Sequence, residues 1–201
     1  MVQVLHRYKS RCNIAELIEL NGKILVRKKH HREETFLREQ KVYQMLHGQQ
    51  LPCAQMLSVE GTTIFMTKLP GSNLVTVLEK QESEGVWNPV VWAKLVDWLV
   101  TFRDLTGLSM TDVNLRNFLY DENTQTVYGL DFEDCGEDSL LFSAGRLAAF
   151  IRTYNPENTR IKQEISQFVL HRFSQQLGVD LQTLFRESKR QETLLLMRRR
   201  R

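Results

Sequence analysis

The feature that most restricts how this chain can fold is an Asn21-Gly22 dipeptide between two runs of β-forming residues, at positions 14–20 and 23–28. Asparagine and glycine both tolerate positive φ, so the pair predicts a two-residue hairpin turn between antiparallel strands. Such a turn leaves the strands one register, because a slip of one residue would move every side chain to the opposite face. The chain is therefore predicted to begin with a β-hairpin whose facing pairs follow from the sequence.

In that register, Ala15 lies opposite Lys28 and Glu16 lies opposite Arg27. Side chains alternate between the faces of a strand, so Lys28 shares a face with Ala15 and Val26, while Arg27 points the other way. We expect Glu16 and Arg27 to form a solvated cross-strand pair. The hairpin thus separates two neighbouring basic residues onto opposite faces.

One helix and two more strands are predicted to follow. Residues 33–46 have helical periodicity, and two short β-rich runs occur at 57–59 and 63–66 before a Pro70-Gly71 break. Four apolar residues are spaced to form one stripe of the helix: Phe36, Leu37, Tyr43 and Leu46. His30 and His31, between the hairpin and the helix, are expected to face solvent.

The rest of the chain is predicted to be mainly helical, with a short β pair at 117–120 and 126–131. The helical patterns lie at 72–80, 88–105, 139–154, 157–177 and 180–189. The expected fold is α+β, with a β-rich lobe over 1–69, a helical lobe over 70–190 and a basic tail over 191–201. A ligand is expected to bind between the two lobes.

Charge and cysteine content exclude several classes. The net charge of +3 arises from four arginines at 198–201, without which 23 basic residues face 24 acidic ones. That balance argues against a broadly basic nucleic-acid-binding domain. The arginines are expected to form a disordered end, with contact to RNA, an anionic surface or an acidic protein as the alternative. Cys12, Cys53 and Cys135 lack zinc-site spacing, and no signal peptide or membrane span is predicted, so a cytoplasmic location is expected.

One group of polar residues in the second half of the chain is typical of sites for phosphoryl transfer. Asp112 is followed five residues later by Asn117, and a short β pair then leads to Asp131 in the segment Leu130-Asp131-Phe132-Glu133-Asp134. A carboxylate can orient an acceptor hydroxyl and take its proton. An amide oxygen and a second carboxylate are hard ligands that suit Mg²⁺ beside phosphates.

These residues resemble the protein kinase-like superfamily, and their spelling is similar to the aminoglycoside and choline phosphotransferase branch. The resemblance implies an enzyme that uses ATP and Mg²⁺ to phosphorylate a hydroxyl. It implies that Asp112 is the catalytic base and that Asn117 and Asp131 are metal ligands. In size the chain is similar to minimal atypical kinases, which also tend to end in a basic tail.

The resemblance also implies how a nucleotide would be held. In such folds a strand lysine pairs with a helix glutamate and holds phosphates; the hairpin register favours Lys28 over its neighbours, and Glu39 is favoured over Glu33 and Glu34, which lie at the helix start. The segment 65–71 resembles an interlobe hinge, whose backbone would contact adenine. The remaining nucleotide-binding candidates are Ser10, Ala15, Met66, Thr67 and Leu69.

Several features depart from that family. The positions of the usual glycine-rich loop hold Tyr8, Ser10 and Asn13, and Met110-Thr111 replaces the usual His-Gly before Asp112. These departures favour an alternative function as a pseudokinase, a nucleotide-binding or interaction module. About eight residues separate Asp131 from the next predicted helix, which leaves no room for an activation loop.

The acceptor is left open by the sequence. The loop spelling favours a small molecule, whereas the short body favours a macromolecule or a large carbohydrate. Arg116, within the loop, has two interpretations: contact with a phosphate, or a salt bridge to Glu133 or Asp134.

Overall fold

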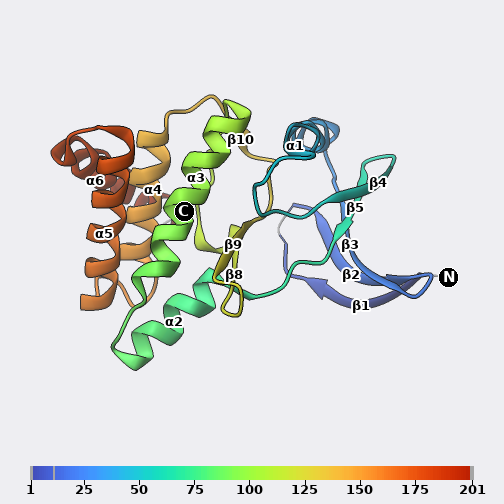
Figure 1. The fold of residues 1–201 in the computed structure, drawn as a ribbon, viewed down its shortest axis with the longest axis horizontal. Coiled ribbons are helices and arrows are strands. Elements are labelled where there is room, and N and C mark those ends of the chain that lie inside the picture. Colours follow the sequence, from blue (N-terminus) through green and yellow to red (C-terminus); the bar gives the residue numbers. More distant parts are fainter. Residues whose placement is uncertain (1, 11, 200–201) are drawn as a thin grey trace.

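The computed structural model describes residues 2–10 and 12–199, with side chains to residue 198, and consists of two parts joined by a single extended connection. Figure 1 shows a twisted sheet with one helix beside it, and a larger group of helices on the opposite side of the connection. The architecture is α+β, as predicted, with strands concentrated before residue 68 and helices after residue 73.

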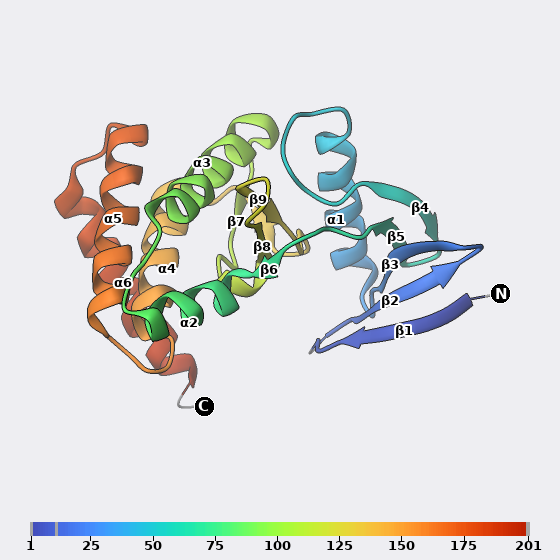
Figure 2. The ribbon, with the colours of Figure 1, turned by 60° about the horizontal axis from the view of Figure 1, so that its bottom comes forward.

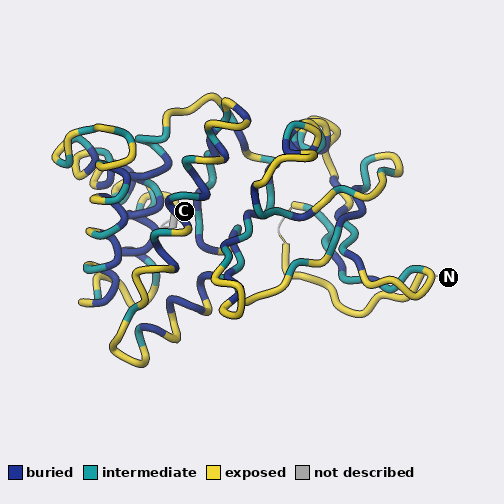
Figure 3. The backbone as a smooth tube through the Cα atoms, viewed as in Figure 1, coloured by how far each residue is buried: buried dark blue, intermediate teal, exposed yellow. Residues whose placement is uncertain are grey.

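The N-terminal lobe contains an antiparallel sheet with strand order β1-β2-β3-β5-β4. Its strands are β1 (Val2–Tyr8), β2 (Ile14–Leu20), β3 (Lys23–Lys29), β4 (Met56–Glu60) and β5 (Thr63–Thr67). Strands β2 and β3 pair in the predicted register, with Ala15 opposite Lys28 and Glu16 opposite Arg27. The edge strand β1 is exposed along its whole length (Figure 3). It lacks a buried alternating face, which explains why hydrophobic patterning does not indicate it.

The Glu16–Arg27 pair differs from the prediction, because Glu16 is only 2% exposed. Its carboxylate receives Arg27 Nη2 at 2.5 Å on one oxygen and Arg7 Nη2 at 2.7 Å on the other. Strand β1, which carries Arg7, therefore covers a pair that the β2–β3 hairpin alone would leave solvated. These hydrogen bonds with the two arginines hold the pKa of Glu16 below its ordinary value.

Helix α1 (Glu33–Leu46) lies beside the sheet on the side toward the helical lobe, as Figure 2 shows. Phe36, Tyr43 and Leu46 are buried on its inner face, but Leu37 is 52% exposed, so its predicted place on the apolar stripe is wrong. Val42 and the carboxylate-bearing Glu39 are buried on this face instead. A charged residue replaces an apolar one there because it has an ionic partner on β3.

The helical lobe begins with the short strand β6 (Ser72–Asn73) and contains five α-helices within the described residues. They are α2 (Leu74–Glu84), α3 (Pro89–Thr106), α4 (Leu140–Thr153), α5 (Arg160–Leu177) and α6 (Leu181–Arg199). Between α3 and α4 lie β7 (Ser109–Met110), a 3-10 turn (Leu115–Asn117), β8 (Phe118–Asp121), β9 (Thr126–Gly129) and β10 (Cys135–Gly136). Among the described residues, no helix combines the length and apolarity needed to cross a membrane.

Helix α6 is longer than predicted and continues to Arg199, because the apolar residues near its end extend the helical pattern. Arg198 and Arg199 therefore belong to a helix, and the expectation of a disordered end is wrong for these two positions. Residues 200 and 201 of the predicted tail lie outside the described part of the chain.

Phe132 links the two lobes. Its ring is fully buried and contacts Tyr43 of α1 edge-on at a centroid distance of 5.1 Å. On the other side it stacks with Phe102 of α3 at 5.6 Å and lies parallel to the ring of Trp98 at 6.2 Å. Aromatic packing of this kind adds stability beyond simple burial. It also fixes the segment around Asp131 relative to both lobes.

Candidate active site

Three elements bring charged groups together between the lobes: β3, α1 and the segment after β9. Lys28 Nζ lies 2.6 Å from Glu39 Oε2 and 2.6 Å from Asp131 Oδ1. The same ammonium lies 3.5 Å from Glu133 Oε2. The structure thus contains the lysine–glutamate pair that the resemblance implied, with the lysine that the hairpin register favoured, and joins it directly to Asp131.

The charges in this cluster control one another. Burial alone would lower the pKa of Lys28, but the carboxylates of Glu39, Asp131 and Glu133 outweigh it and raise this pKa above its ordinary value. Burial works to raise the pKa of Glu39, yet the charge of Lys28 holds it below its ordinary value. Burial raises the pKa of Glu133, the negative charges of Asp131 and Glu39 act in the same direction, and together these effects outweigh the charge of Lys28. Lys28 therefore remains cationic and Glu39 anionic at neutral pH.

Two residues of this cluster were not predicted as site residues. His30 is 2% exposed rather than solvent-facing, and its Nε2 lies 3.0 Å from Glu39 Oε2. Glu133 receives a hydrogen bond from Asn13 Nδ2, and its backbone oxygen accepts one from Arg38 Nη1 at 3.0 Å. Ligand atoms of His30, Glu39 and Glu133 lie within 4.8 Å of one another, but the Lys28 ammonium already supplies a cation there. The position of Glu133 in Asp131-Phe132-Glu133, two residues after a predicted metal ligand, was the sequence feature that could have indicated its place in the cluster.

Asp112 is held from two directions. Its Oδ1 accepts a hydrogen bond from Arg146 Nη2 of α4 at 2.9 Å, and its Oδ2 accepts one from Asn114 Nδ2 at 2.7 Å. Asn117 Nδ2 donates to the backbone oxygen of Asp112 at 3.0 Å. The loop that carries Asp112 is therefore fixed by its own amides and by α4. Arg146 was not a sequence candidate, since it is distant in the chain and belongs to no local motif.

Asn117 and Asp131 are placed side by side by the β8–β9 pair. Leu130 N–H donates to the Asn117 carbonyl at 2.8 Å, which positions Asp131 one residue beyond that contact. The Asn117 amide nitrogen is engaged with Asp112, and Asp131 Oδ1 is engaged with Lys28. Among the described residues, Asn117 Oδ1 and Asp131 Oδ2 are therefore the oxygens of this pair left for a cation. Asp131 has a φ of 61°, a conformation that Asp and Asn adopt more readily than most residues. This donor set fits Mg²⁺.

The other nucleotide-binding candidates belong to the β1–β2 turn and to the end of β5, and several of their polar groups already have partners. Ser10 and Ala15 flank the β1–β2 turn, where Ser10 Oγ accepts the Asn13 N–H at 3.2 Å. Met66 is buried within β5, and the Thr67 N–H already donates to Gln55 at 3.0 Å. Leu69, just beyond β5, packs against the main core. The Thr67 N–H is therefore bonded within the N-terminal lobe, and contact of the 65–71 backbone with adenine stays a prediction.

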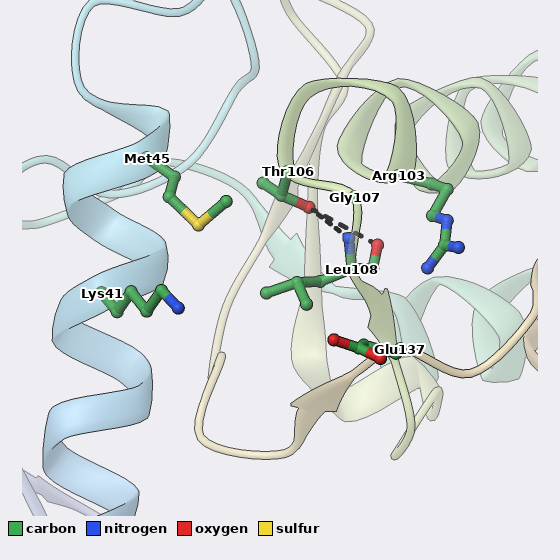
Figure 4. Close-up of a pocket in the computed structure, with 7 residues that line it drawn as sticks. All are labelled: Lys41, Met45, Arg103, Thr106, Gly107, Leu108 and Glu137. Atoms are coloured by element: carbon green, nitrogen blue, oxygen red, sulfur yellow. Dashed lines mark hydrogen bonds between the residues drawn. The ribbon is translucent and has the colours of Figure 1, made fainter.

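The larger of the two described cavities, about 440 Å³, lies elsewhere, between α1 and the end of α3 (Figure 4). None of the predicted site residues lines it. The lining residues are Lys41, Met45, Arg103, Thr106, Gly107, Leu108 and Glu137. A second hollow of about 270 Å³ lies against β2–β5, also away from Asp112. The charged groups between the lobes, rather than either cavity, define the candidate active site.

The arrangement is that of a kinase-like fold: a small antiparallel sheet with one helix, a helical lobe, and a catalytic-type loop between them. No family model and no curated protein matches the sequence. Among solved structures, the chain is similar to the kinase PK-1 of Cydia pomonella granulovirus, with a TM-score of 0.57 and 16% identity. The match covers 67% of this chain and 54% of that kinase. At this identity the similarity shows the fold alone.

Proposed function

We propose that this protein is an ATP- and Mg²⁺-dependent phosphotransferase that transfers the γ-phosphoryl group to a hydroxyl. The observation that carries the proposal is the single linked cluster in which Lys28 joins Glu39 to Asp131 at 2.6 Å each. Asp131 in turn lies beside Asn117, whose amide is bonded to the Asp112 backbone. Phosphoryl transfer depends on positioning and charge neutralisation, and this cluster offers groups for both.

Each residue has a separate task in this proposal. Lys28, braced by Glu39, binds phosphate oxygens, and Asn117 and Asp131 hold Mg²⁺, which neutralises charge on the phosphates. Asp112 orients the acceptor hydroxyl and accepts its proton as the oxygen attacks phosphorus in line with the leaving group. The two hydrogen bonds to Asp112 keep its carboxylate in one orientation for that step. The spelling of the loop further supports a relationship to the aminoglycoside and choline phosphotransferase branch.

The experiment measures thermal stabilisation by ATP with and without Mg²⁺, followed by phosphoryl transfer from radiolabelled ATP to a panel of hydroxyl compounds. We expect a metal-dependent increase in Tm. D112N should retain that increase and lose turnover, whereas D131N should lose the metal-dependent part. D104N, which changes an exposed carboxylate on α3, is the matched control. Full turnover by D112N would exclude Asp112 from the assigned role.

One observation favours the alternative function, a pseudokinase that acts as an interaction module. The β1–β2 turn has no glycine-rich loop, and Asn13 from this turn contacts Glu133 beside Asp131. A turn held there would compete with nucleotide phosphates for the same space. Absence of any Tm change at millimolar ATP, with and without Mg²⁺, in both wild type and N13A would favour the module over the enzyme. A metal-dependent change in Tm favours the enzyme.

A further inference from the structure

Arg116, the residue immediately before Asn117, has an unusual environment for a loop arginine. Its guanidinium carbon lies 5.9 Å from the ring centroid of Phe150 and 5.7 Å from that of Tyr154. Both rings belong to the α4 side of the molecule, and Arg116 itself is exposed to solvent. The side chain is therefore supported on aromatic surface, and part of its guanidinium bonds the Tyr154 hydroxyl while the residue as a whole stays exposed.

Neither predicted salt bridge of Arg116 is present. Within the part of the chain that the structure describes, Arg116 forms no ion pair with a carboxylate. Glu133 contacts Lys28 and Asn13 instead. Glu79 of α2 accepts a hydrogen bond from the Tyr154 hydroxyl at 2.9 Å. Arg116 thus carries a permanent positive charge beside the catalytic-type loop without an anionic partner.

The backbone of Arg116 is also fixed. Its N–H donates to Asn114 Oδ1 at 2.9 Å, and its carbonyl accepts a hydrogen bond from Asn73 Nδ2 at 2.7 Å. Asn114 bonds Asp112 as well, at 2.7 Å, so one side chain links the position of Arg116 to that of the proposed base. A guanidinium with a fixed backbone and stacked support loses little conformational entropy when it binds an oxyanion.

Helix α4 contacts both Asp112 and Arg116. Arg146, which bonds Asp112, precedes Phe150 by four residues, and Tyr154 follows the last residue of the helix. Residues four apart lie on the same face of a helix, so one face of α4 contacts Asp112 through Arg146 and Arg116 through Phe150. The proposed base and the Arg116 guanidinium are therefore supported by the same helix face.

We propose that Arg116 binds a phosphate monoester on the acceptor, so that the substrate class is a phosphorylated hydroxyl compound rather than a neutral one. This inference rests on the proposed function, since it uses Asp112 as the site of the attacking hydroxyl. The planar guanidinium matches two phosphate oxygens, and the doubly charged monoester gains more from it than a neutral sugar does.

Binding is tested first, by a readout that does not need turnover. The Nε–Hε resonance of Arg116, assigned with R116Q, is followed by NMR during titration with inorganic phosphate, glucose 6-phosphate, glucose and gluconate. We expect saturable shifts with both phosphate compounds and none with glucose. Equal shifts with gluconate would overturn the phosphate class in favour of a general anion site. No shift with any anion would overturn the inference altogether.

Turnover is tested next with sugars and polyols paired with their own phosphate monoesters. R116Q should reduce kcat/KM for the phosphorylated member of a pair about tenfold and leave the neutral member within twofold, mainly through KM. R116K should recover part of the loss, and R190Q, at an exposed arginine of α6, should match wild type. Equal losses for both members would overturn the inference. The Tm response to ATP and Mg²⁺, measured on the same variants, reports separately on the proposed function.

Discussion

Arg146 of α4 donates a hydrogen bond to Asp112 at 2.9 Å, and this contact connects the catalytic-type loop to the helical lobe. The arginine side chain is 12% exposed, whereas that of Asp112 is 45% exposed. A mostly buried cation therefore holds one oxygen of a carboxylate that remains accessible to a substrate. The geometry supports Arg146 as a positioning residue, which acts through Asp112.

Substitution of Arg146 should separate catalysis from nucleotide binding. We expect R146Q to reduce kcat about 10- to 100-fold, because a carboxylate displaced by about 1 Å orients the hydroxyl poorly. The ATP- and Mg²⁺-dependent change in Tm should persist, because Arg146 does not touch the Lys28 cluster. R146K should recover part of kcat, and R186Q on α6 is the control. A rise in KM for ATP with unchanged kcat would contradict the positioning role.

Removal of the Lys28 charge should destabilise the fold in a pH-dependent way. K28M leaves Glu39, Asp131 and Glu133 without their shared cation, and we expect a loss of about 3 kcal/mol in the free energy of unfolding at pH 7.5. The loss should be smaller at pH 5, because the raised pKa of Glu133 lets this carboxyl take up a proton more easily. Urea unfolding at both pH values gives the comparison.

The exposed neighbour on the same strand provides the control for that measurement. K29M removes a lysine that makes no ion pair with a described residue, and its free energy of unfolding should stay within about 0.5 kcal/mol of wild type. An equal loss for K28M at pH 5 and pH 7.5 would show that repulsion between the carboxylates does not cause the destabilisation.

The sequence predicted the features that depend on local rules. Asn21-Gly22 determines a turn, a turn determines a register, and the register places Lys28 on the face where Glu39 meets it. It did not predict Arg146 or the burial of His30, because those depend on how distant segments pack. Leu37 is exposed although it was predicted on the apolar stripe, for the same reason: the ionic partner of Glu39 on β3 decides which face of α1 turns inward.

Glu16 should make stability depend on pH in the acid range. Its pKa is lowered in the folded protein by hydrogen bonds from Arg27 and Arg7, so folding favours the ionised form. This contribution is complete above the unfolded value near 4.5 and is lost as pH falls through the folded pKa. E16Q should therefore cost about 1 kcal/mol at pH 7, and this cost should shrink as the pH falls below 4.5. E60Q, at the exposed end of β4, is the control, and a constant difference across this range would contradict the assignment.

Gly129, which ends β9 two residues before Asp131, should not tolerate a side chain. A Cβ at this position would overlap the indole of Trp98, approaching its Cε2 to 2.8 Å. The indole has little room to move, because its Nε1 donates to the Pro52 carbonyl at 2.8 Å and its ring stacks on Phe102 at 5.3 Å. We expect G129A to lower the free energy of unfolding by about 1 to 3 kcal/mol through overpacking.

A smaller ring at position 98 tests whether Trp98 is the residue that a side chain at Gly129 would meet. Phenylalanine at position 98 lacks the indole atoms that a Cβ on Gly129 would meet, so G129A should cost less in a W98F background than in wild type. The four proteins of this double-mutant cycle are compared by urea unfolding. G136A, whose Cβ would approach only a methyl group of Thr111 at 3.3 Å, should be nearly neutral. Because Phe132 lies parallel to Trp98, G129A should also weaken the Mg²⁺-dependent change in Tm, and W98F should restore part of it. Additive effects of G129A and W98F would show that the strain lies elsewhere than at this contact.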